Sequence, residues 1–590
     1  MKLFLKVREQ GKGFVNTVLR FPVTMLFLIL TAIWCFIAIN QQNFEQYSKL
    51  MLSFVLGASI YVVLQMMHER FFSKPITRYI FMVVPYVLAL IYYLMIKELE
   101  FNIKISVRTT VLFFILLIAF LWVPAIKSRI NFNQSFMAAF KAFFMAVLFS
   151  GLLFVGILLI LGATDMLILD VSDKSYAHAA NIIFVLFFPI YFLSMIPAYP
   201  RNEFDGSDIS QELLMKQVTP SRFLEALISY VAIPIATVFT VILLLYIFMN
   251  IREDFWTDNL MEPLLVSYSI VVIIVYLLAS TVMNAVTKYF RLIFPKVLLL
   301  VVLFQTISSL LKIQEAGISY GRYYVIMFGV FAILASIWFC IKPVQSNGII
   351  APVIIILSLI SILPFVNAFS VSRANQISRL VNALERNYML EDDKIIPNAD
   401  IPKQDMETIR SSVQYLSRLE YTKEINWLRH YDKTNNDFEK TFGFPEYSVD
   451  DQGKINDYIT VMRKQSSPIS VAGYDFMTRL YVYDKNVDTV LNNYEIDGKA
   501  YTLNLVNSSA DQQDILLKDR EQEVIRFPLS DLYKKFEDEN GNKELETLDV
   551  TFTKENERAV ITVIAESINI NIWQDGNSRQ ADINILVKLK

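Results

Sequence analysis

Apolar runs of about 20 residues recur between residues 21 and 369, and they constrain the fold more than any other feature. Crossing the ~30 Å hydrocarbon core of a bilayer takes about 20 helical residues. Because backbone amide and carbonyl groups find no partner in lipid, such runs have to be helices; a barrel would show short alternating segments instead. We therefore predict a polytopic α-helical membrane bundle of about 11 spans. The predicted spans are 21–40, 50–67, 79–96, 107–126, 142–164, 177–198, 226–249, 263–284, 297–311, 323–341 and 348–369.

The distribution of Lys and Arg predicts the orientation of these spans. With the N-terminus inside, the inner segments hold 18 Lys and Arg residues and the outer loops hold 8. Cytoplasmic loops carry the excess of basic residues in membrane proteins. We therefore expect a cytoplasmic N-terminus and, after an odd number of spans, an extracellular C-terminal region. A miscount by one span would place that region in the cytoplasm.

The chain changes character after residue 370, which predicts a transmembrane domain at 1–370 and a soluble domain at 371–590. The first part carries 26 Lys and Arg against 18 Asp and Glu, and the second carries 28 against 38. An acidic domain is not attracted to nucleic acid by bulk charge, so we expect no nucleic-acid partner. Both cysteines, Cys35 and Cys340, fall in predicted spans. Disulfides and thiolate zinc sites are thereby excluded from the soluble domain.

The soluble domain shows helical periodicity first and strand periodicity later. Residues 372–388 and 404–419 have apolar side chains at helical spacing. From about residue 468 the apolar residues alternate, and Asp497-Gly498 is a two-residue hairpin signal. This order predicts an α+β domain with an antiparallel sheet.

No motif for catalysis or cofactor binding stands out. The span interiors hold almost no ionisable groups, which transporters and pumps usually keep there. The only acidic cluster near a membrane face is the loop with Glu253, Asp254, Asp258 and Glu262, for which a solvated loop is the simpler interpretation. We therefore expect a protein that is not an enzyme and has no cofactor.

One local pattern fits a metal ligand set. Asp484, Asn486, Asp488 and Glu495 fall at positions 1, 3, 5 and 12 of a calcium-binding loop. Thr489 occupies the position that needs glycine, and no helix is predicted before the loop. The alternative is a polar turn between two strands.

Four stretches have a recognisable pattern: 230–263, with Tyr230-Val-Ala-Ile-Pro234; 317–323, Gly-Ile-Ser-Tyr-Gly-Arg-Tyr; 364–397, with Ser372-Arg-Ala-Asn-Gln-Ile-Ser-Arg379-Leu380; and 469–475, Ile-Ser-Val-Ala-Gly-Tyr-Asp. Together they resemble domain-of-unknown-function family 4153, multi-pass membrane proteins of Gram-positive bacteria. The likeness covers roughly residues 130–480. Ser319 stands where the family often has Thr, and both residues cap helices. The resemblance implies a bacterial plasma membrane location and implies no activity.

The second and third stretches lie where spans meet the outer surface. We hypothesise that Arg322, Tyr323, Ser372 and Arg379 dock together there and hold the soluble domain against the bundle. The alternative is that each stretch only caps its own helix.

These features favour a non-catalytic envelope protein that acts as a sensor, scaffold or accessory subunit. Its expected partners are the lipid bilayer and another membrane or cell-envelope protein. The alternatives are a permease or flippase for a neutral or lipid substrate, and a membrane-embedded enzyme that would use the acidic loop.

Overall fold

The computed structural model describes residues 14–99, 101–199, 214–250, 261–429, 431, 438–446, 458–464, 467–483, 489–496, 498–509, 512–520, 522–536, 541–571 and 578–590. By their contacts, residues 1–386 and 411–425 form one unit, which contains the helical bundle. Residues 387–410 and 426–590 form the other, which contains the β-sheets. Helices α16 (Ala368–Arg386) and α17 (Lys403–Arg418) follow the last apolar segment and precede the sheets in the sequence. All of α16 and residues 411–418 of α17 nevertheless belong to the unit that contains the bundle.

Among the described residues, ten helical segments are long and apolar enough to cross a membrane. They correspond in order to the first ten predicted spans. Their elements are α2 (Pro22–Gln41), α3 (Phe44–Phe71), α4 (Pro75–Ile96), α5 (Ile103–Trp122), α6 (Phe132–Leu167), α7 (Asp173–Ala180) continuing through η2 (Asn181–Phe187) into α8 (Phe188–Ser194), α10 (Arg222–Leu227) continuing through η3 (Ile228–Ala232) into α11 (Ile233–Asn250), α12 (Met261–Ala279), α13 (Ala285–Ala316) and α14 (Tyr320–Ile341). The predicted span 348–369 corresponds to a shorter apolar segment, Val344–Ile360, made of η5 (Val344–Ile349) and α15 (Ile350–Ile360).

The helix starts follow from capping side chains. Asn131 accepts from the Gln134 amide while the Gln134 side chain accepts from the Asn131 amide, which fixes the start of α6. Ser319 caps α14 in the simpler way, by accepting from the Arg322 amide.

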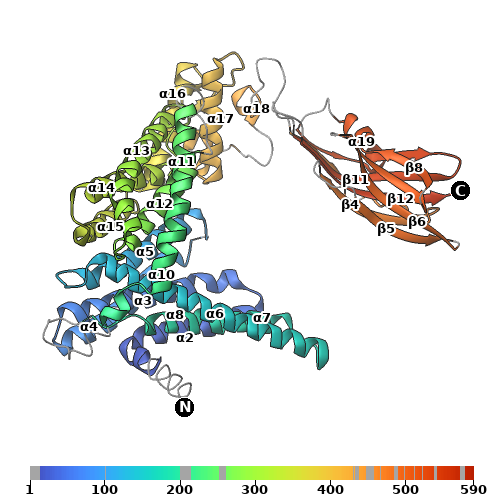
Figure 1. Cartoon of the computed structure of the whole chain (residues 1–590). Helices are drawn as coiled ribbons and strands as arrows, with labels where there is room; N and C mark the ends of the chain where they lie inside the picture. The colour runs from blue at the N-terminus through green and yellow to red at the C-terminus, as the bar shows by residue number, and fades with distance from the viewer. Residues whose placement is uncertain are drawn as a thin grey trace. The chain divides into compact units, whose positions relative to one another are not determined.

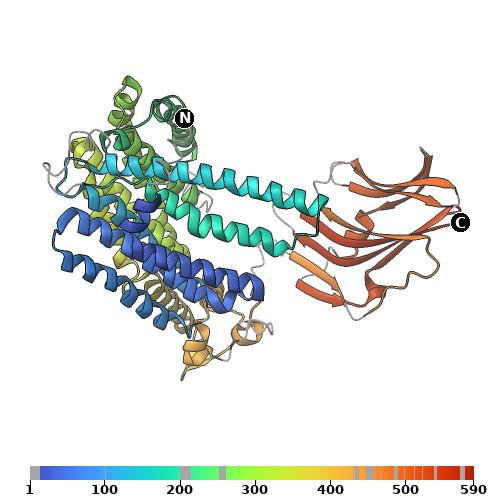
Figure 2. The same cartoon turned by 90° about the horizontal axis from the view of Figure 1, so that it is seen from below.

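In Figure 1, α11 and α12 run up the page, whereas α6 and α7 run across it. Figure 2 shows α6 lying alongside α7 and α8.

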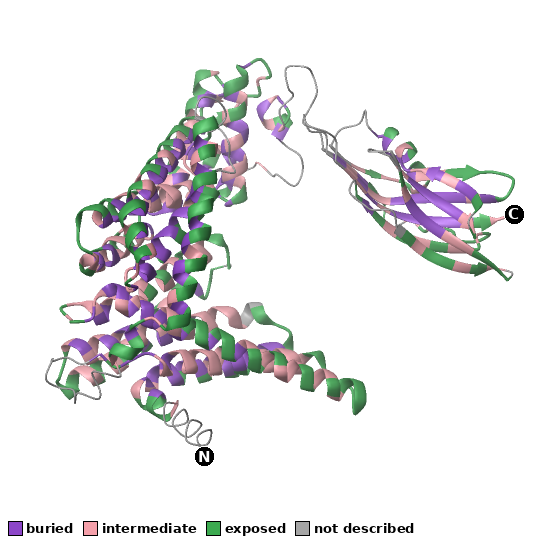
Figure 3. Ribbon diagram, in the orientation of Figure 1, coloured by how far each residue is buried: buried purple, intermediate pink, exposed green. Residues whose placement is uncertain are grey.

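Apolar side chains cover the outside of the bundle as well as its interior. Leu152, Leu159 and Phe248 are 68%, 70% and 80% exposed. Helices that are hydrophobic all round belong in the core of a large protein or in a membrane. Figure 3 shows the exposed residues along the outer faces of these helices.

The helix ends form two groups according to their polar contacts. We call the group that contains Arg20 the near end. Arg20 donates to Glu69 at 2.7 Å and to the Pro197 carbonyl at 3.1 Å. Lys141 donates to the Thr219 carbonyl at 2.7 Å. Other contacts of this group join Arg70 to Ile126, Asn284 to Ser229, and Asn133 to Asn347.

The opposite group of helix ends, which we call the far end, is joined by a separate set of contacts. Lys174 donates to the Asn40 carbonyl at 2.9 Å, and Lys49 donates to the Lys97 carbonyl at 3.0 Å. The Ser309 hydroxyl donates to the Glu262 carboxylate. Each segment from α2 to α14 therefore has one end in the near group, and successive segments run alternately away from it and toward it.

The short segment 344–360 forms an antiparallel hairpin with α14. At one end, the Trp338 ring nitrogen donates to the Ser346 carbonyl at 3.1 Å. At the other, the Tyr323 hydroxyl donates to the Val366 carbonyl at 2.7 Å. Although 344–360 is short, the chain from 344 to 366 returns along α14 to the far end, where α16 begins.

Two sheets make up the C-terminal part of the chain. The larger has strand order β4-β12-β11-β3-β9, and β10 pairs with β11. The smaller has order β5-β6-β7-β8, and all of its pairs are antiparallel. The strands are β3 (Tyr458–Arg463), β4 (Phe476–Tyr483), β5 (Thr489–Ile496), β6 (Lys499–Ser509), β7 (Gln512–Asp519), β8 (Gln522–Pro528), β9 (Gly541–Leu545), β10 (Thr551–Glu555), β11 (Ala559–Asn571) and β12 (Ser578–Leu589), with a short helix α19 (Ser530–Lys534).

The sequence-predicted α+β order and antiparallel sheet are confirmed. The hairpin signal lies between β5 and β6, where Ile496 pairs with Lys499 and Gly498 has a φ of 75°. One pair, β3 with β9, is parallel. Alternating residues of both sheets form one hydrophobic core, for example Ile515, Leu517, Ile583 and Ile585.

Candidate functional site

The turn between α13 and α14 is the centre of the polar contacts around the predicted docking residues. Helix α13 ends at Ala316, and Gly317 follows it with a φ of 71°. Helices commonly end with a residue in the left-handed backbone conformation at this position, and glycine adopts that conformation without steric strain. The last carbonyl groups of α13 have no partners within the helix. They are therefore available to side chains from elsewhere.

Two arginines donate to backbone carbonyl groups at this turn. Arg379, from α16, donates to the Gln314 carbonyl at 2.9 Å. Arg322, from the first turn of α14, donates to the Gly317 carbonyl at 2.7 Å. A positive charge at a helix C-terminus also interacts favourably with the helix dipole. Burial, and secondarily Arg322, lower the pKa of the Arg379 guanidinium below its ordinary value.

Neutral side chains of α16 and α17 complete the contacts with this turn. Gln376 donates to the Ala316 carbonyl at 3.1 Å, and its own side-chain oxygen accepts from Ser412 at 3.0 Å. The Tyr415 hydroxyl donates to Ser372 at 2.8 Å and accepts from the Tyr320 amide at 2.9 Å. We call this set, Arg322, Ser372, Gln376, Arg379 and Tyr415, the turn clamp.

The structure brings three of the four predicted docking residues, Arg322, Ser372 and Arg379, to this one turn. Tyr323 lies at the neighbouring hairpin and contacts Val366 instead. Gln376 and Tyr415 were not singled out from the sequence. Gln376 lies inside the stretch 364–397 that carries the family resemblance. Tyr415 lies on the apolar face of an amphipathic helix, where the sequence does not indicate a polar partner.

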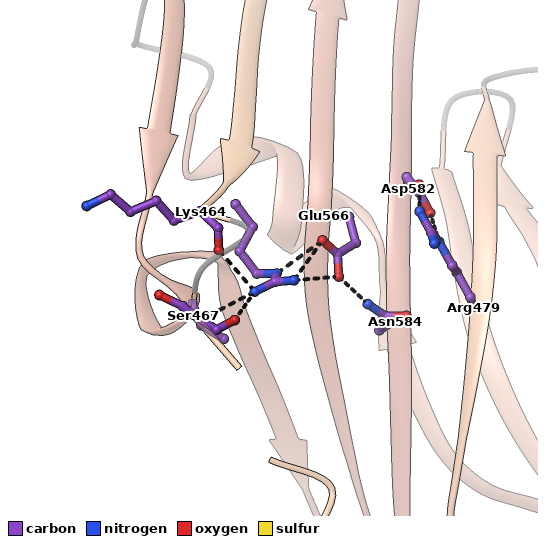
Figure 4. Close-up of polar contacts among 8 residues, drawn as sticks. Lys464, Ser467, Arg479, Glu566, Asp582 and Asn584 are labelled. Atoms are coloured by element: carbon purple, nitrogen blue, oxygen red, sulfur yellow. Dashed lines mark hydrogen bonds and ion pairs between the residues drawn. The ribbon is translucent and has the colours of Figure 1, made fainter. Parts of the chain in front are cut away.

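A polar network lies on the outward face of the larger sheet (Figure 4). Glu566 sits at a register shift in β11, between Ala565 and Ser567. Its carboxylate accepts from Arg463 at 3.1 Å and from Asn584 at 2.7 Å. The Arg463 side chain is only 9% exposed, so this ion pair is well shielded from water.

The rest of this face is more exposed. Arg479 pairs with Asp582, and its hydrogen bonds lower the pKa of the Asp582 carboxyl. Tyr481 and Tyr483 are 53% and 47% exposed, and Met477 is 43% exposed. Tyr, Met and Arg are residue types enriched in protein interfaces. We call Met477, Arg479, Tyr481, Tyr483 and Asp582 the sheet face.

An apolar cavity of about 600 Å³ lies within the bundle. Its walls come from α5, α6, α12, α14 and α15. A second, more polar cavity of about 490 Å³ includes Arg129, Trp122 and Trp338, and Phe132 lines both cavities.

Most residues of the two acidic clusters named from the sequence lie outside the described residues. These are Asp484, Asn486 and Asp488 of the calcium pattern, and Glu253, Asp254 and Asp258 of the loop. Glu495 is an exposed residue of β5, and Glu262 accepts from Ser309. In the part of the chain that the structure describes, no three His, Cys, Asp or Glu residues are grouped as a metal site would require.

A family model described as a domain of unknown function, DUF4153, matches residues 22–401 of the chain. The match spans the whole bundle together with α16. It ends before α17, so the sheets lie beyond it. Neither the curated proteins nor the solved structures contain a match to this chain.

Proposed function

This chain belongs to the DUF4153 family, and we propose that it is a multi-pass plasma-membrane protein whose C-terminal sheets lie outside the cytoplasm and bind a cell-envelope or membrane-protein partner. It acts as a sensor, scaffold or accessory subunit and catalyses no reaction. Its N-terminus is cytoplasmic. A bacterial, Gram-positive cell is the setting that the family resemblance favours.

The main support for the proposed side of the membrane is that residues 344–366 run back along α14. If α14 crosses the bilayer, this segment brings the chain back to the side on which α14 began. The near end holds most of the predicted inner Lys and Arg residues, and such residues favour the cytoplasm. Helix α16 begins at the far end. These two arguments together support an extracytoplasmic position for the chain after α16.

The turn clamp suggests how a signal from outside reaches the bundle. Residues 411–418 of α17 belong to the same helix as residues 403–410, which group with the sheets. A continuous helix transmits a displacement from one end to the other. Tyr415 on this helix contacts the α13–α14 turn through Tyr320. Movement of α17 would therefore act on the start of α14.

Crosslinking in intact cells tests the partner proposal. A photoreactive amino acid at Tyr481, on the sheet face, should form a specific adduct with a cell-envelope or membrane protein. The matched position Leu548 is 86% exposed and lies on the 3₁₀ helix before β10. It should give no adduct of the same mass. Equal adducts at both positions, or none at Tyr481, would contradict the proposal.

The apolar cavity favours a second candidate, a lipid permease or flippase. A lipid substrate needs no buried charge, and the cavity lining consists almost entirely of aliphatic and aromatic residues. Proteoliposomes with a fluorescent phospholipid distinguish the two candidates. Transfer of the probe between leaflets would support the flippase. Absence of transfer, in vesicles that do show partner crosslinking, would support the scaffold.

A further inference from the structure

The apolar cavity of the bundle is surrounded by helices that leave one side open. Helix α15 packs against α5 and α14, and α12 packs against α14. The start of α6 closes one end of the cavity with Phe132 and Phe136. Along their described residues, α5 and α12 flank the cavity without packing closely against each other. The cavity is therefore a slot between α5 and α12, closed at the back by α14 and α15.

The open side of this slot faces the surroundings of the bundle. Leu117 of α5 is 52% exposed and Ile270 of α12 is 42% exposed, although both line the cavity. In a bilayer, apolar side chains on the outside of a helical bundle contact acyl chains. A hydrocarbon chain can therefore enter the slot sideways without passing a polar group.

The length of the slot matches one leaflet of a bilayer. Its lining extends along α5 from Thr110 to Leu121, which is about 16 Å at the rise of an α-helix. One leaflet takes up about half of the ~30 Å hydrocarbon core. A helix of another protein that crosses the membrane needs the full thickness, whereas Phe132 and Phe136 close the slot after one leaflet. An acyl chain fits this length and a spanning helix does not.

The polar side chains of the lining gather at one end of the slot. They are the hydroxyl-bearing residues Thr110, Tyr324, Ser358 and Ser361, and they lie at the end opposite Phe132. Tyr324 also donates to the Ser361 carbonyl at 3.5 Å, which joins α14 and α15 at this end. Hydroxyl groups can donate to the ester carbonyls that link acyl chains to glycerol. All described residues of the lining are uncharged, so the slot offers no charge that would select a headgroup.

We propose that the slot holds one acyl chain of a phospholipid from the bilayer, with its ester group at the hydroxyl end and its methyl end at Phe132. The hydrocarbon chain is recognised, and the charge of the headgroup is not. This proposal deepens the second candidate function, on whose cavity it rests, but it requires no transfer of lipid between leaflets. If α14 begins outside the cytoplasm, as proposed above, the bound lipid belongs to the outer leaflet.

Photolabelling of the full chain in detergent tests the site and the direction of the bound chain. The probes are two phosphatidylcholines, with a diazirine either at the methyl end of one acyl chain or next to its ester group. The first should label the peptide that contains Phe132 and Phe136, and the second the peptides that contain Tyr324 and Ser358. Excess dipalmitoyl phosphatidylcholine should abolish both adducts, because a bound chain is saturable. Labelling that the competitor does not reduce, or adducts in the reverse positions, would overturn the proposal.

Competition by other lipids shows which part of the molecule is recognised. Dipalmitoyl phosphatidylglycerol should compete within about twofold of the phosphatidylcholine, whereas dioctanoyl phosphatidylcholine should compete at least about tenfold more weakly, because it buries fewer methylene groups. A strong preference for one headgroup, or equal competition by the short-chain lipid, would contradict recognition of the chain. Neither outcome depends on a transfer assay, so this proposal and the flippase can fail separately.

Substitutions at the entrance of the slot complete the test. Leu117→Trp should fill the entrance and lower the saturable labelling about tenfold, whereas Leu117→Ala should preserve it. Ile242→Trp is the matched control, since Ile242 is 58% exposed on α11 and does not line the cavity. Thermal unfolding checks that each variant is folded, and Ile270→Trp on the opposite wall repeats the test if Leu117→Trp is unstable. Equal labelling of the slot variants and the Ile242→Trp control would contradict the proposal.

Discussion

Arginine side chains are held by different partners in the bundle and in the sheets. In the bundle, Arg70 donates to the Ile126 carbonyl at 3.3 Å and Arg291 to the Val282 carbonyl at 2.8 Å, whereas Arg20 donates both to the Pro197 carbonyl and to the Glu69 carboxylate. In the sheets, Arg463 pairs with Glu566 and Arg479 pairs with Asp582, although Arg463 also donates to the carbonyls of Lys464 and Ser467. A helix leaves its last four carbonyls unpartnered, whereas a strand inside a sheet uses its carbonyls in the ladder. An arginine at a helix end can therefore be satisfied by carbonyls alone, as Arg291 is, whereas Arg463 and Arg479 on the larger sheet pair with carboxylates.

This difference matches the media in which we propose the two regions lie. Carbonyl partners satisfy a guanidinium near a membrane without placing a second charge there, which would be costly to bury. Ion pairs on a water-exposed sheet carry no such cost but respond to pH and salt.

Gly317→Ala should give the largest effect, because it disrupts the turn clamp in two ways. A Cβ at Gly317 would lie 2.6 Å from the Gln376 amide nitrogen and 2.7 Å from the Arg379 Cδ, and the φ of 71° strains any L side chain. We expect a loss of about 3 kcal/mol in the stability of the bundle. Thermal unfolding in detergent measures it.

Gly321→Ala is the matched control for that change. Gly321 lies in the first turn of α14, where a Cβ would meet only the Ser319 hydroxyl, at 3.9 Å. Alanine is the better helix former, so this variant should be as stable as the unchanged protein. Equal destabilisation by both substitutions would show that the turn clamp does not depend on the Gly317 conformation.

Glu566→Gln should destabilise the sheets by about 3 kcal/mol, because it leaves the shielded Arg463 charge without its carboxylate. Asp582→Asn is the comparison, since its partner Arg479 has a side chain that is 65% exposed. Exposed pairs contribute little. Urea unfolding measures the stability of both variants, with a probe that does not depend on tryptophan, such as far-ultraviolet circular dichroism. The contrast fails if Asp582→Asn is the more destabilising change.

Arg379→Ala should weaken the turn clamp by roughly 1–2 kcal/mol, which is the loss expected for hydrogen bonds from a charged donor. Arg386→Ala serves as the control, because Arg386 donates to Asn382 of its own helix. Limited proteolysis of α16 and α17 in native membranes measures the difference. Faster cleavage is expected for the Arg379 variant alone, and equal cleavage rates would contradict its assigned role.

Acidification should destabilise the sheets and spare the turn clamp. Hydrogen bonds from Arg526 and Arg479 lower the pKa values of Glu523 and Asp582 from 4.5 and 3.8. Carboxyls with lowered folded-state pKa values stabilise the fold above their ordinary values, and this contribution is lost as pH falls through the folded values. We therefore expect sheet stability to decline below about pH 4.5, while the carbonyl partners of Arg379 do not titrate. Parallel decline of both regions would contradict this.

The positions of the helices could be predicted from the sequence, but their lengths could not. The span predicted at 142–164 belongs to α6, which begins at Phe132. Hydropathy identifies the part of a helix that suits lipid, whereas α6 begins directly after its Asn131 cap, ten residues before the predicted span. Helices 372–388 and 404–419 were predicted within a few residues of α16 and α17, because amphipathic spacing extends to the helix ends.

Contacts between distant segments were beyond prediction from the sequence. Periodicity identifies strands but not their order, so the pairing of β4 with β12, about 100 residues apart in sequence, had no signal. The turn clamp was anticipated through Arg322, Ser372 and Arg379, because they lie at span ends. Its neutral members, Gln376 and Tyr415, were missed because their polar partners are backbone groups or residues far along the chain.

Cysteine labelling establishes on which side of the membrane the sheets lie. In a full-length background with Cys35→Ala and Cys340→Ala, the probe is Leu548→Cys, at a position that is 86% exposed. Lys127→Cys, at the near end, is the internal control. Our account predicts that a membrane-impermeant maleimide labels position 548 in intact cells and position 127 only after lysis. Labelling of position 548 only after lysis would place the sheets in the cytoplasm and contradict the account.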